Sequence, residues 1–255
     1  MAASSCSAAS TDPREPGLTH IAIAFDNLMG LVVRDGADTE LVRGQYDLAM
    51  DTVRALGIAL WPMNSRFQAD DALVTDAARY AEDSAIEQVI ICSADADFAQ
   101  CVRGERVVVL NRITKTCLTE SDVVERYGVV PERIPEYLAL VGDRSDGIPG
   151  IPGFGPKAAA VVINRYGRLE DIPTDPDTAW DVRIRGVTRL SETFRTRRLE
   201  ALLYRNLSIR GLSVPLPHSL EDLRWQGASE QLVAEMATAL ADPAILERTI
   251  RYRQP

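Results

Sequence analysis

Short apolar runs alternate with amphipathic segments through the first half of the chain. Between Val42 and Leu56, apolar side chains recur every three or four residues, the spacing of a helix with one buried face, and Gly57 ends the pattern. Residues 70–80 predict a second helix, with acids in its first turn, where the helix dipole favours them. Apolar runs of strand length lie at residues 21–25, 58–61, 88–92 and 106–110. This alternation predicts an α/β fold with a mostly parallel sheet covered by helices.

The pattern changes near Thr119, where strand-like runs stop and helical spacing takes over. Helices are predicted over residues 120–127, 133–141, 157–166, 189–205 and 229–240. Residues 1–18 are small, polar and interrupted by proline, which is typical of a disordered tail. We therefore expect an α/β domain at 19–118, a small all-helical domain at 119–213 and a helical extension at 214–255, where nothing suggests chemistry.

Composition is that of an ordinary globular protein, with 46% hydrophobic and 25% charged residues. No window approaches the roughly 18 consecutive apolar residues of a membrane helix, so we expect no membrane partner. The four cysteines form no CxxC pair, and no secretory apolar segment follows the first residues. These features favour a reduced, cytoplasmic chain, and we expect a monomer.

Charge is unevenly distributed. The net charge of −9 by itself argues against a nucleic-acid partner, because phosphates attract Lys and Arg. Residues 143–210, however, contain 12 basic and 9 acidic side chains, so the excess acid lies in the first half. A solvated face and a phosphate contact both stay open for four arginines on the predicted helix 189–205: Arg195, Arg197, Arg198 and Arg205.

Seven aspartates stand where the chain leaves a predicted strand or opens a helix: Asp26, Asp70, Asp71, Asp95, Asp97, Asp143 and Asp146. Ligands of parallel sheets bind beyond the carboxyl ends of the strands. Carboxylates that converge there need cations among them, and their oxygens suit Mg²⁺ or Mn²⁺. Two such ions serve phosphodiester hydrolysis. Taken alone, Asp70 and Asp71 equally suit a helix N-terminus. A chance turn also accounts for the Asp95-Ala-Asp97 triplet, and it does so better than the DxD motif of haloacid-dehalogenase-type phosphatases.

A glycine-rich segment precedes the predicted helix 157–166 and reads Gly147-Ile-Pro-Gly-Ile-Pro-Gly-Phe-Gly-Pro-Lys157. Glycines allow close approach to a partner, and the free N–H groups of a new helix bind anions. This build is typical of a helix-hairpin-helix that holds a phosphate backbone without reading bases, although a plain helix-helix turn shares the spacing. The candidate contacts to such a phosphate backbone are Gly150, Gly153, Gly155 and Lys157.

The segment Asp143-Arg-Ser-Asp146 together with the glycine-rich run resembles the helix-three-turn-helix region of 5′-nucleases: bacterial 5′→3′ exonucleases, the 5′-nuclease domain of DNA polymerase I and flap endonucleases. Supporting matches run in the same order, nearly collinear over residues 19–213: Ala24-Phe-Asp26, Ala69-Asp-Asp-Ala72, Ser93-Ala-Asp-Ala-Asp-Phe98 and Tyr137-Leu-Ala-Leu-Val-Gly-Asp143.

The resemblance implies a PIN-like (Rossmann-like) nuclease domain, a helix-three-turn-helix domain, and metal-dependent hydrolysis of DNA with a 5′ end or flap. Two Mg²⁺ or Mn²⁺ ions are implied, with Asp26 and Asp70 at the first and Asp71 adjacent. Asp95, Asp97 and Asp146 match the second site, with Asp143 beside it. A K⁺ ion is implied at the hairpin against duplex phosphate.

The sequence departs from this family in several places. We find no counterpart of the family's opening strand with its Asp-Gly pair. A family glutamate is replaced by Gln68, whose amide brings no charge, and a family lysine is replaced by Ala96. The stretch 31–40 is short and acidic, and Arg34 is its only base and candidate DNA contact. These departures favour, as the alternative function, a catalytically impaired DNA-binding remnant. A PIN-type ribonuclease shares the acids but does not explain the hairpin.

Overall fold

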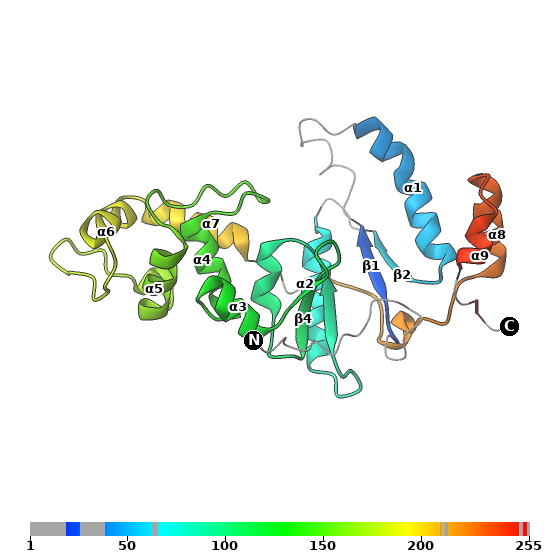
Figure 1. Cartoon of the computed structure of the whole chain (residues 1–255), viewed down its shortest axis with the longest axis horizontal. Helices are drawn as coiled ribbons and strands as arrows, with labels where there is room; N and C mark the ends of the chain where they lie inside the picture. The colour runs from blue at the N-terminus through cyan, green and yellow to red at the C-terminus, as the bar shows by residue number, and fades with distance from the viewer. Residues whose placement is uncertain are drawn as a thin grey trace. The chain divides into compact units, whose positions relative to one another are not determined.

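The computed structural model describes residues 19–25, 39–62, 66–209, 211, 214–249 and 252–253, and for residues 39–43 the backbone only. The chain divides into two compact units (Figure 1). Unit 1 combines the described residues up to 76 with those from 214 onward, and unit 2 consists of the described residues between 77 and 211. Each unit is described on its own.

Unit 1 contains a parallel strand pair. Strand β1 (Ala22–Phe25) pairs with β2 (Ala59–Pro62), with Ala22 opposite Ala59. Parallel strands need a long crossover, and helix α1 (Thr39–Ala55) lies in this connection. Gly57 follows α1 with a φ of 69°. The predicted strands, the helix between them and its glycine end are therefore confirmed.

The C-terminal segment completes unit 1. Helix α8 (Glu230–Ala239) packs against α1, and the short helix α9 (Ala244–Arg248) packs against α8. The 3₁₀ helix η5 (Glu221–Leu223) precedes them. The backbone N–H of Ile21 donates to Leu223 O at 2.9 Å, and the indole of Trp225 donates to Leu56 O at 2.8 Å. Residues from both ends of the sequence thus build one core.

Unit 2 contains a three-stranded sheet of order β3-β4-β5. Strand β3 (Val89–Cys92) pairs in parallel with β4 (Val107–Asn111), which pairs antiparallel with β5 (Thr116–Leu118). The strands predicted at 88–92 and 106–110 are confirmed, and β5 was not predicted. Helix α2 (Ala69–Ala81), also predicted, carries the chain from unit 1 into unit 2. Two of the three strand pairings in the described residues are parallel, as expected.

Helices make up the rest of unit 2: α3 (Glu120–Tyr127), η3 (Pro131–Arg133), α4 (Ile134–Val141), α5 (Pro156–Tyr166), η4 (Leu169–Asp171), α6 (Val187–Thr196) and α7 (Arg198–Ser208). Helix α4 is buried from Ile134 to Leu140 and packs against both α5 and α7, so it is the centre of this part. No helix in the described ranges is long and apolar enough to cross a membrane.

The single helix predicted at 189–205 is wrong. Arg197 has a φ of −113° and a ψ of 19°, which separates α6 from α7. The Thr196 hydroxyl donates to the carbonyls of Glu192 and Thr193, a local bond that competes with helix continuation. Helix α6 buries Leu190 and Phe194, and helix α7 buries Ala201, so the helical spacing of apolar residues in the sequence continues across the break.

Candidate functional site

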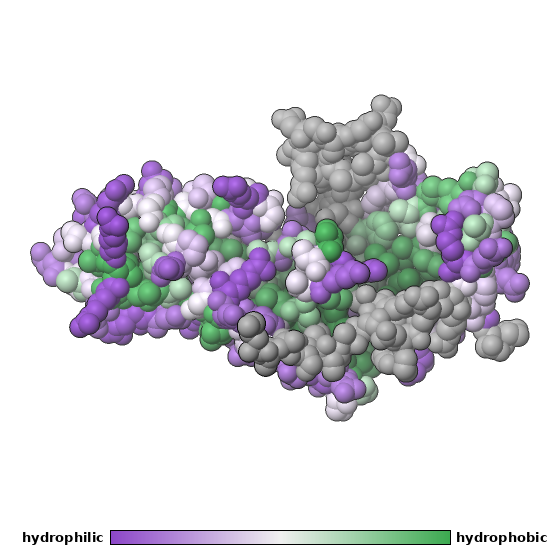
Figure 2. Space-filling view, in the orientation of Figure 1, coloured by the Kyte–Doolittle hydropathy of each residue, from purple (hydrophilic) through white to green (hydrophobic). Residues whose placement is uncertain are grey.

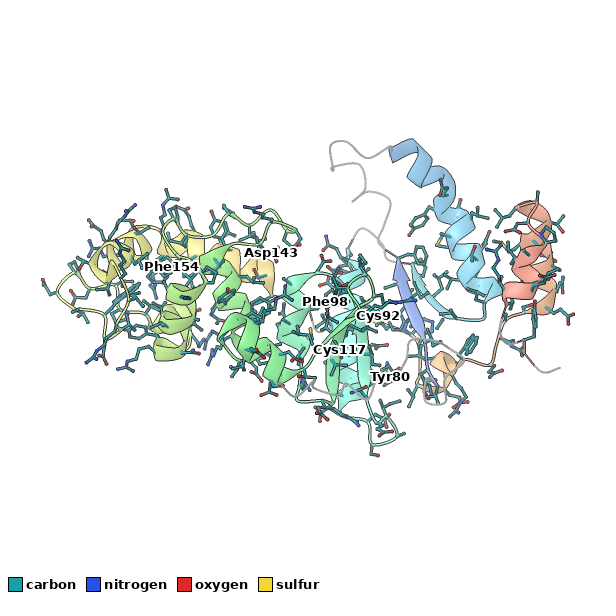
Figure 3. All side chains as sticks on the ribbon, in the orientation of Figure 1. Tyr80, Cys92, Phe98, Cys117, Asp143 and Phe154 are labelled. Atoms are coloured by element: carbon teal, nitrogen blue, oxygen red, sulfur yellow. The ribbon has the colours of Figure 1, made fainter. Side chains whose placement is uncertain are left out.

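The turn after α4 holds a buried aspartate. Asp143 and Ile148 exchange backbone hydrogen bonds of 2.8 and 2.7 Å, which close a tight turn. One carboxylate oxygen of Asp143, Oδ1, accepts from the N–H and the hydroxyl of Ser145. The other, Oδ2, is buried and has no hydrogen-bond partner among the described residues. A buried carboxylate oxygen without a partner is costly, and a bound cation or water would relieve that cost. Asp143 is labelled in Figure 3.

A second buried aspartate lies on the 3₁₀ helix η2 (Ala96–Cys101), which packs against α4. This residue is Asp97, exposed by only 1%, and its neighbour Phe98 is fully buried. Burial raises the pKa of the Tyr127 hydroxyl, the charge of Arg126 opposes this rise, and the charges of Asp143 and Asp97 add to it. Unit 2 therefore brings the two buried aspartates into the surroundings of one tyrosine, which the sequence did not single out.

The other two predicted aspartates of unit 2 are exposed. Asp95 precedes η2, and Asp146 lies in the same turn as Asp143. Asp95 also borders an open groove of about 700 Å³, formed with the β4–β5 hairpin and α3 and lined further by Asn111, Asp122, Arg126 and Tyr127, among others. Buried and exposed carboxylates thus occur together near the carboxyl end of β3.

Hard divalent cations prefer oxygen ligands, and the buried Oδ2 of Asp143 is an oxygen that such a cation could accept as a ligand. Across the described residues, no three His, Cys, Asp or Glu side chains lie close enough together to enclose a metal ion. Asp26 and Arg34 lie outside the described residues. The two ions and their aspartate ligands therefore stay a prediction.

Asp70 and Asp71 open helix α2 in unit 1, as predicted. The backbone N–H of Gln68 donates to Asp71 Oδ2 at 3.2 Å, a contact that stabilises the helix start. This hydrogen bond supports the interpretation that Asp71 stabilises the N-terminus of α2. The Gln68 residue is exposed. A further acid of this helix, Asp76, is buried and was not singled out by the sequence.

The glycine loop (residues 147–157) folds back tightly against the end of α4. Gly147, Gly150 and Gly153 have φ values of 69°, 73° and 91°. A Cβ on Gly150 would lie 2.6 Å from both Gly142 N and Val141 C, so no side chain fits there. Glycine is needed at this position to let one backbone segment pass against another.

The loop ends at the N-terminus of α5. Gly155 has a φ of −105° and open space around it, so its lack of a side chain is not a packing requirement. Pro156 occupies the first helical position, and no side chain in the described part of the chain caps the helix start. Lys157 is exposed beside it. Uncapped N–H groups and a lysine are the features that favour an anion at this end of α5.

Of the four arginines left open by the sequence, three have partners within unit 2: Arg197, Arg198 and Arg205. Arg205 forms an ion pair with Glu170 at 2.6 Å, and Arg197 pairs with Glu200 at 3.1 Å. Arg198 donates to the Glu170 carbonyl at 3.1 Å. These side chains therefore stabilise the helical part, and the interpretation of a simple solvated face is wrong for Arg205, whose side chain is only 13% exposed.

Two family models match consecutive parts of the chain. The model of the 5'-3' exonuclease N-terminal resolvase-like domain matches residues 14–128, and that of the 5'-3' exonuclease C-terminal SAM fold matches residues 129–231. The chain belongs to the 5'-3' exonuclease family. The predicted α/β domain followed by a helical domain is thereby confirmed.

Curated relatives of this exonuclease-family chain include larger proteins. DNA polymerase I of Bacillus caldotenax is 33% identical over 210 residues, covering 80% of this chain and 23% of the polymerase. A 5'-3' exonuclease of Aquifex aeolicus is 36% identical over 128 residues, covering 50% of this chain and 43% of that protein. The chain thus spans about a quarter of the polymerase relative and less than half of the exonuclease.

Solved structures share the fold of this family member at low sequence identity. The T5 D15 protein co-crystallized with metal ions has a TM-score of 0.54 and 20% identity, covering 70% of this chain and 64% of that one. The catalytic core of Rad2 in complex with DNA substrate has a TM-score of 0.53 and 16% identity, covering 90% of this chain and 77% of that one.

Proposed function

We propose that this chain is a metal-dependent 5′→3′ exonuclease or structure-specific 5′-nuclease that hydrolyses phosphodiesters of DNA with two Mg²⁺ or Mn²⁺ ions. The observation that carries the proposal is the unpartnered, buried Oδ2 of Asp143 in a unit that also buries Asp97. Family membership supports it, as do the similar structures that contain metal ions or a DNA substrate.

Each aspartate has a proposed role. Asp95, Asp97 and Asp146, with Asp143 beside them, would hold one ion. Asp26 and Asp70, with Asp71 adjacent, would hold the other. Divalent ions bound there would lower the pKa of the water that acts as nucleophile and would stabilise the leaving oxygen. The chain's own part is positional, since Ser145 fixes Oδ1 of Asp143 and leaves Oδ2 available.

The proposed substrate is duplex DNA with a 5′ end or flap, held at the glycine loop. The start of α5, with Lys157, would contact backbone phosphates, and a K⁺ ion would bridge the loop to DNA. Cys92 carries a free thiol, and we propose that the protein acts in the reducing cytoplasm. We further propose that the protein acts as a monomer.

Cleavage of labelled DNA tests the proposal. The full chain with Mg²⁺ or Mn²⁺ is expected to shorten 5′-labelled flap and duplex DNA, and Asp97→Asn and Asp143→Asn are each expected to lower the rate at least 100-fold, an order of magnitude that loss of charge stabilisation supports. Asp177→Asn is the matched control, because this exposed loop aspartate makes no side-chain contact in the described structure. Equal cleavage rates for the wild-type chain and Asp97→Asn under both metals would refute the proposed nuclease activity.

The second candidate is a DNA-binding remnant without catalysis. Gln68 favours it, because the exposed residue brings no charge and its N–H only helps to start α2. This candidate predicts salt-dependent binding to branched duplex that Lys157→Ala weakens, with no cleavage under any metal. Cleavage of RNA but not DNA would instead favour the ribonuclease reading.

A further inference from the structure

The connection between η4 and α6 is held by a buried tryptophan. Trp180 is 7% exposed and contacts three aromatic rings, with centroid distances of 6.3 Å to Phe154, 6.3 Å to Tyr166 and 5.8 Å to Phe194. Its indole N–H donates to Pro173 O at 2.9 Å. Phe154 belongs to the glycine loop and is labelled in Figure 3. Because the rings pack together, the connection is fixed directly to the glycine loop.

The residue after this tryptophan fixes the connection a second time. The Asp181 backbone N–H donates to the Tyr166 hydroxyl at 2.8 Å. Its carboxylate pairs with Arg165 at 2.8 Å. Both partners lie at the end of α5, so the path of the chain beyond Asp181 is set by the helix that follows the glycine loop.

The start of α6 also packs against the glycine loop. A Cβ built on Gly153 would lie 3.2 Å from Leu190 Cδ2, and Leu190 is buried. The connection and α6 therefore touch the loop at two of its residues, Phe154 and Gly153. Residues 181–189, named here the arginine segment, run between these two contacts.

The arginine segment carries three exposed guanidinium groups, on Arg183, Arg185 and Arg189. None makes an ion pair or a side-chain hydrogen bond within the described parts of the chain. Arg165, Arg197 and Arg205 of the same helical part all have acidic partners. Hydrophilic residues are prominent over α5 and α6 in Figure 2. Three uncompensated cations on a well-fixed segment form a site for a polyanion.

We propose that the arginine segment is a second phosphate-binding surface, continuous with the glycine loop, that extends the grip on duplex DNA. The inference rests on the proposed function, because it takes the same DNA as ligand. Guanidinium groups suit phosphate oxygens and carry no base information, so this surface increases affinity for any sequence.

Salt dependence of binding gives the test its magnitude. Each phosphate neutralised in B-DNA adds about 0.9 to the slope of log affinity against log salt concentration. Three arginines therefore add about 2.7. Between about 50 and 200 mM KCl, the affinity of the wild-type chain is expected to fall about 40-fold more than that of a variant without them.

The experiment measures binding of the full chain to fluorescent duplex DNA without divalent metal, by anisotropy over this salt range. The variants are R183A/R185A/R189A and the charge-retaining R183K/R185K/R189K. Arg197→Ala is the control, an exposed arginine that is already paired. The alanine variant is expected to have a slope smaller by about 2.7 than the wild-type chain. The lysine variant and Arg197→Ala are expected to keep the wild-type slope.

An unchanged slope in the alanine variant, together with weaker binding by Lys157→Ala, would overturn the proposal that the arginine segment binds phosphate. The glycine loop would then be the DNA contact. Equal loss in the lysine variant would overturn the electrostatic role and point to distortion of the loop. Absence of wild-type binding would overturn this surface together with the DNA-binding part of the proposed function, an outcome distinct from the other two.

Discussion

Three glycine-to-alanine substitutions in the glycine loop separate two costs of adding a side chain. One is the strain of a left-handed backbone, and the other is steric overlap of the new Cβ with neighbouring atoms. Gly155→Ala meets neither obstacle, since its φ is −105° and no atom lies within 4 Å of an added Cβ. Gly147→Ala meets only the left-handed φ of 69°, again in open space. Gly150→Ala meets both, because its φ is 73° and the added Cβ would lie 2.6 Å from two backbone atoms.

The expected costs follow from these geometries. Gly155→Ala replaces a helix cap and should lower the free energy of unfolding by about 0.5–1 kcal/mol. Gly147→Ala should cost about 1–2 kcal/mol for the left-handed backbone. Gly150→Ala adds an overlap that only movement of the α4 end can relieve, about 1–3 kcal/mol more, so about 2–5 kcal/mol in total.

Urea unfolding followed by circular dichroism measures the three free energies, with the denaturant slope checked for constancy. DNA affinity is measured on the same proteins, and Gly155→Ala should weaken it despite its small cost in stability, because the new methyl stands where the backbone would approach phosphate. Equal destabilisation by Gly147→Ala and Gly150→Ala would refute the steric argument.

Three further predictions concern charge. Gln68→Glu should lower the Mg²⁺ concentration for half-maximal cleavage, because it restores a carboxylate to the first proposed site; unchanged metal titration curves would contradict this. Burial raises the pKa of Glu136, while Arg133 and Arg205 oppose the rise less strongly. Its ionised form is therefore the penalised one, and stability present below the ordinary pKa of about 4.3 is lost as pH rises through the higher folded value. Glu136→Gln should flatten this decline in melting temperature measured from pH 4 to 8, and an unaltered pH profile would count against it. Arg205→Ala removes the 2.6 Å pair with Glu170 and should lower the free energy of unfolding by about 2 kcal/mol in a urea titration, whereas Arg197→Ala, a more exposed pair, should cost under 1 kcal/mol.

The alternation of strands and helices was predictable because strands β1 to β4 each lie in a short apolar run of the sequence. Strand β5 was not, since Thr116-Cys117-Leu118 is three residues long and owes its conformation to pairing with β4. The break at Arg197 was hidden for a related reason, because apolar residues on two helices can keep the spacing of one. Local pattern therefore identifies elements that have a buried face of their own, and misses those that tertiary contacts create.

The candidate site divides in the same way. The glycine pattern predicted the close backbone approach seen at Gly150. The aspartates were visible as acids at strand ends, but burial of Asp97 and Asp143 beside Tyr127 depends on the packing of η2 against α4, which are distant in sequence. A single tyrosine at a helix end carries no periodic signal, so only the structure brings it into view.

Unit 1 is built from two segments that lie far apart in the sequence, and this affects the order of folding during translation. Residues 19–62 leave the ribosome well before residues 214–253, whose backbone and side chains complete their hydrogen bonds, as in the bonds from Ile21 to Leu223 and from Trp225 to Leu56. Unit 2 lies in one uninterrupted stretch and has all of its strands and helices when residue 211 emerges. We therefore expect unit 2 to fold first during translation. Unit 1, with strands β1 and β2, is expected to finish folding last, although these strands are synthesised first.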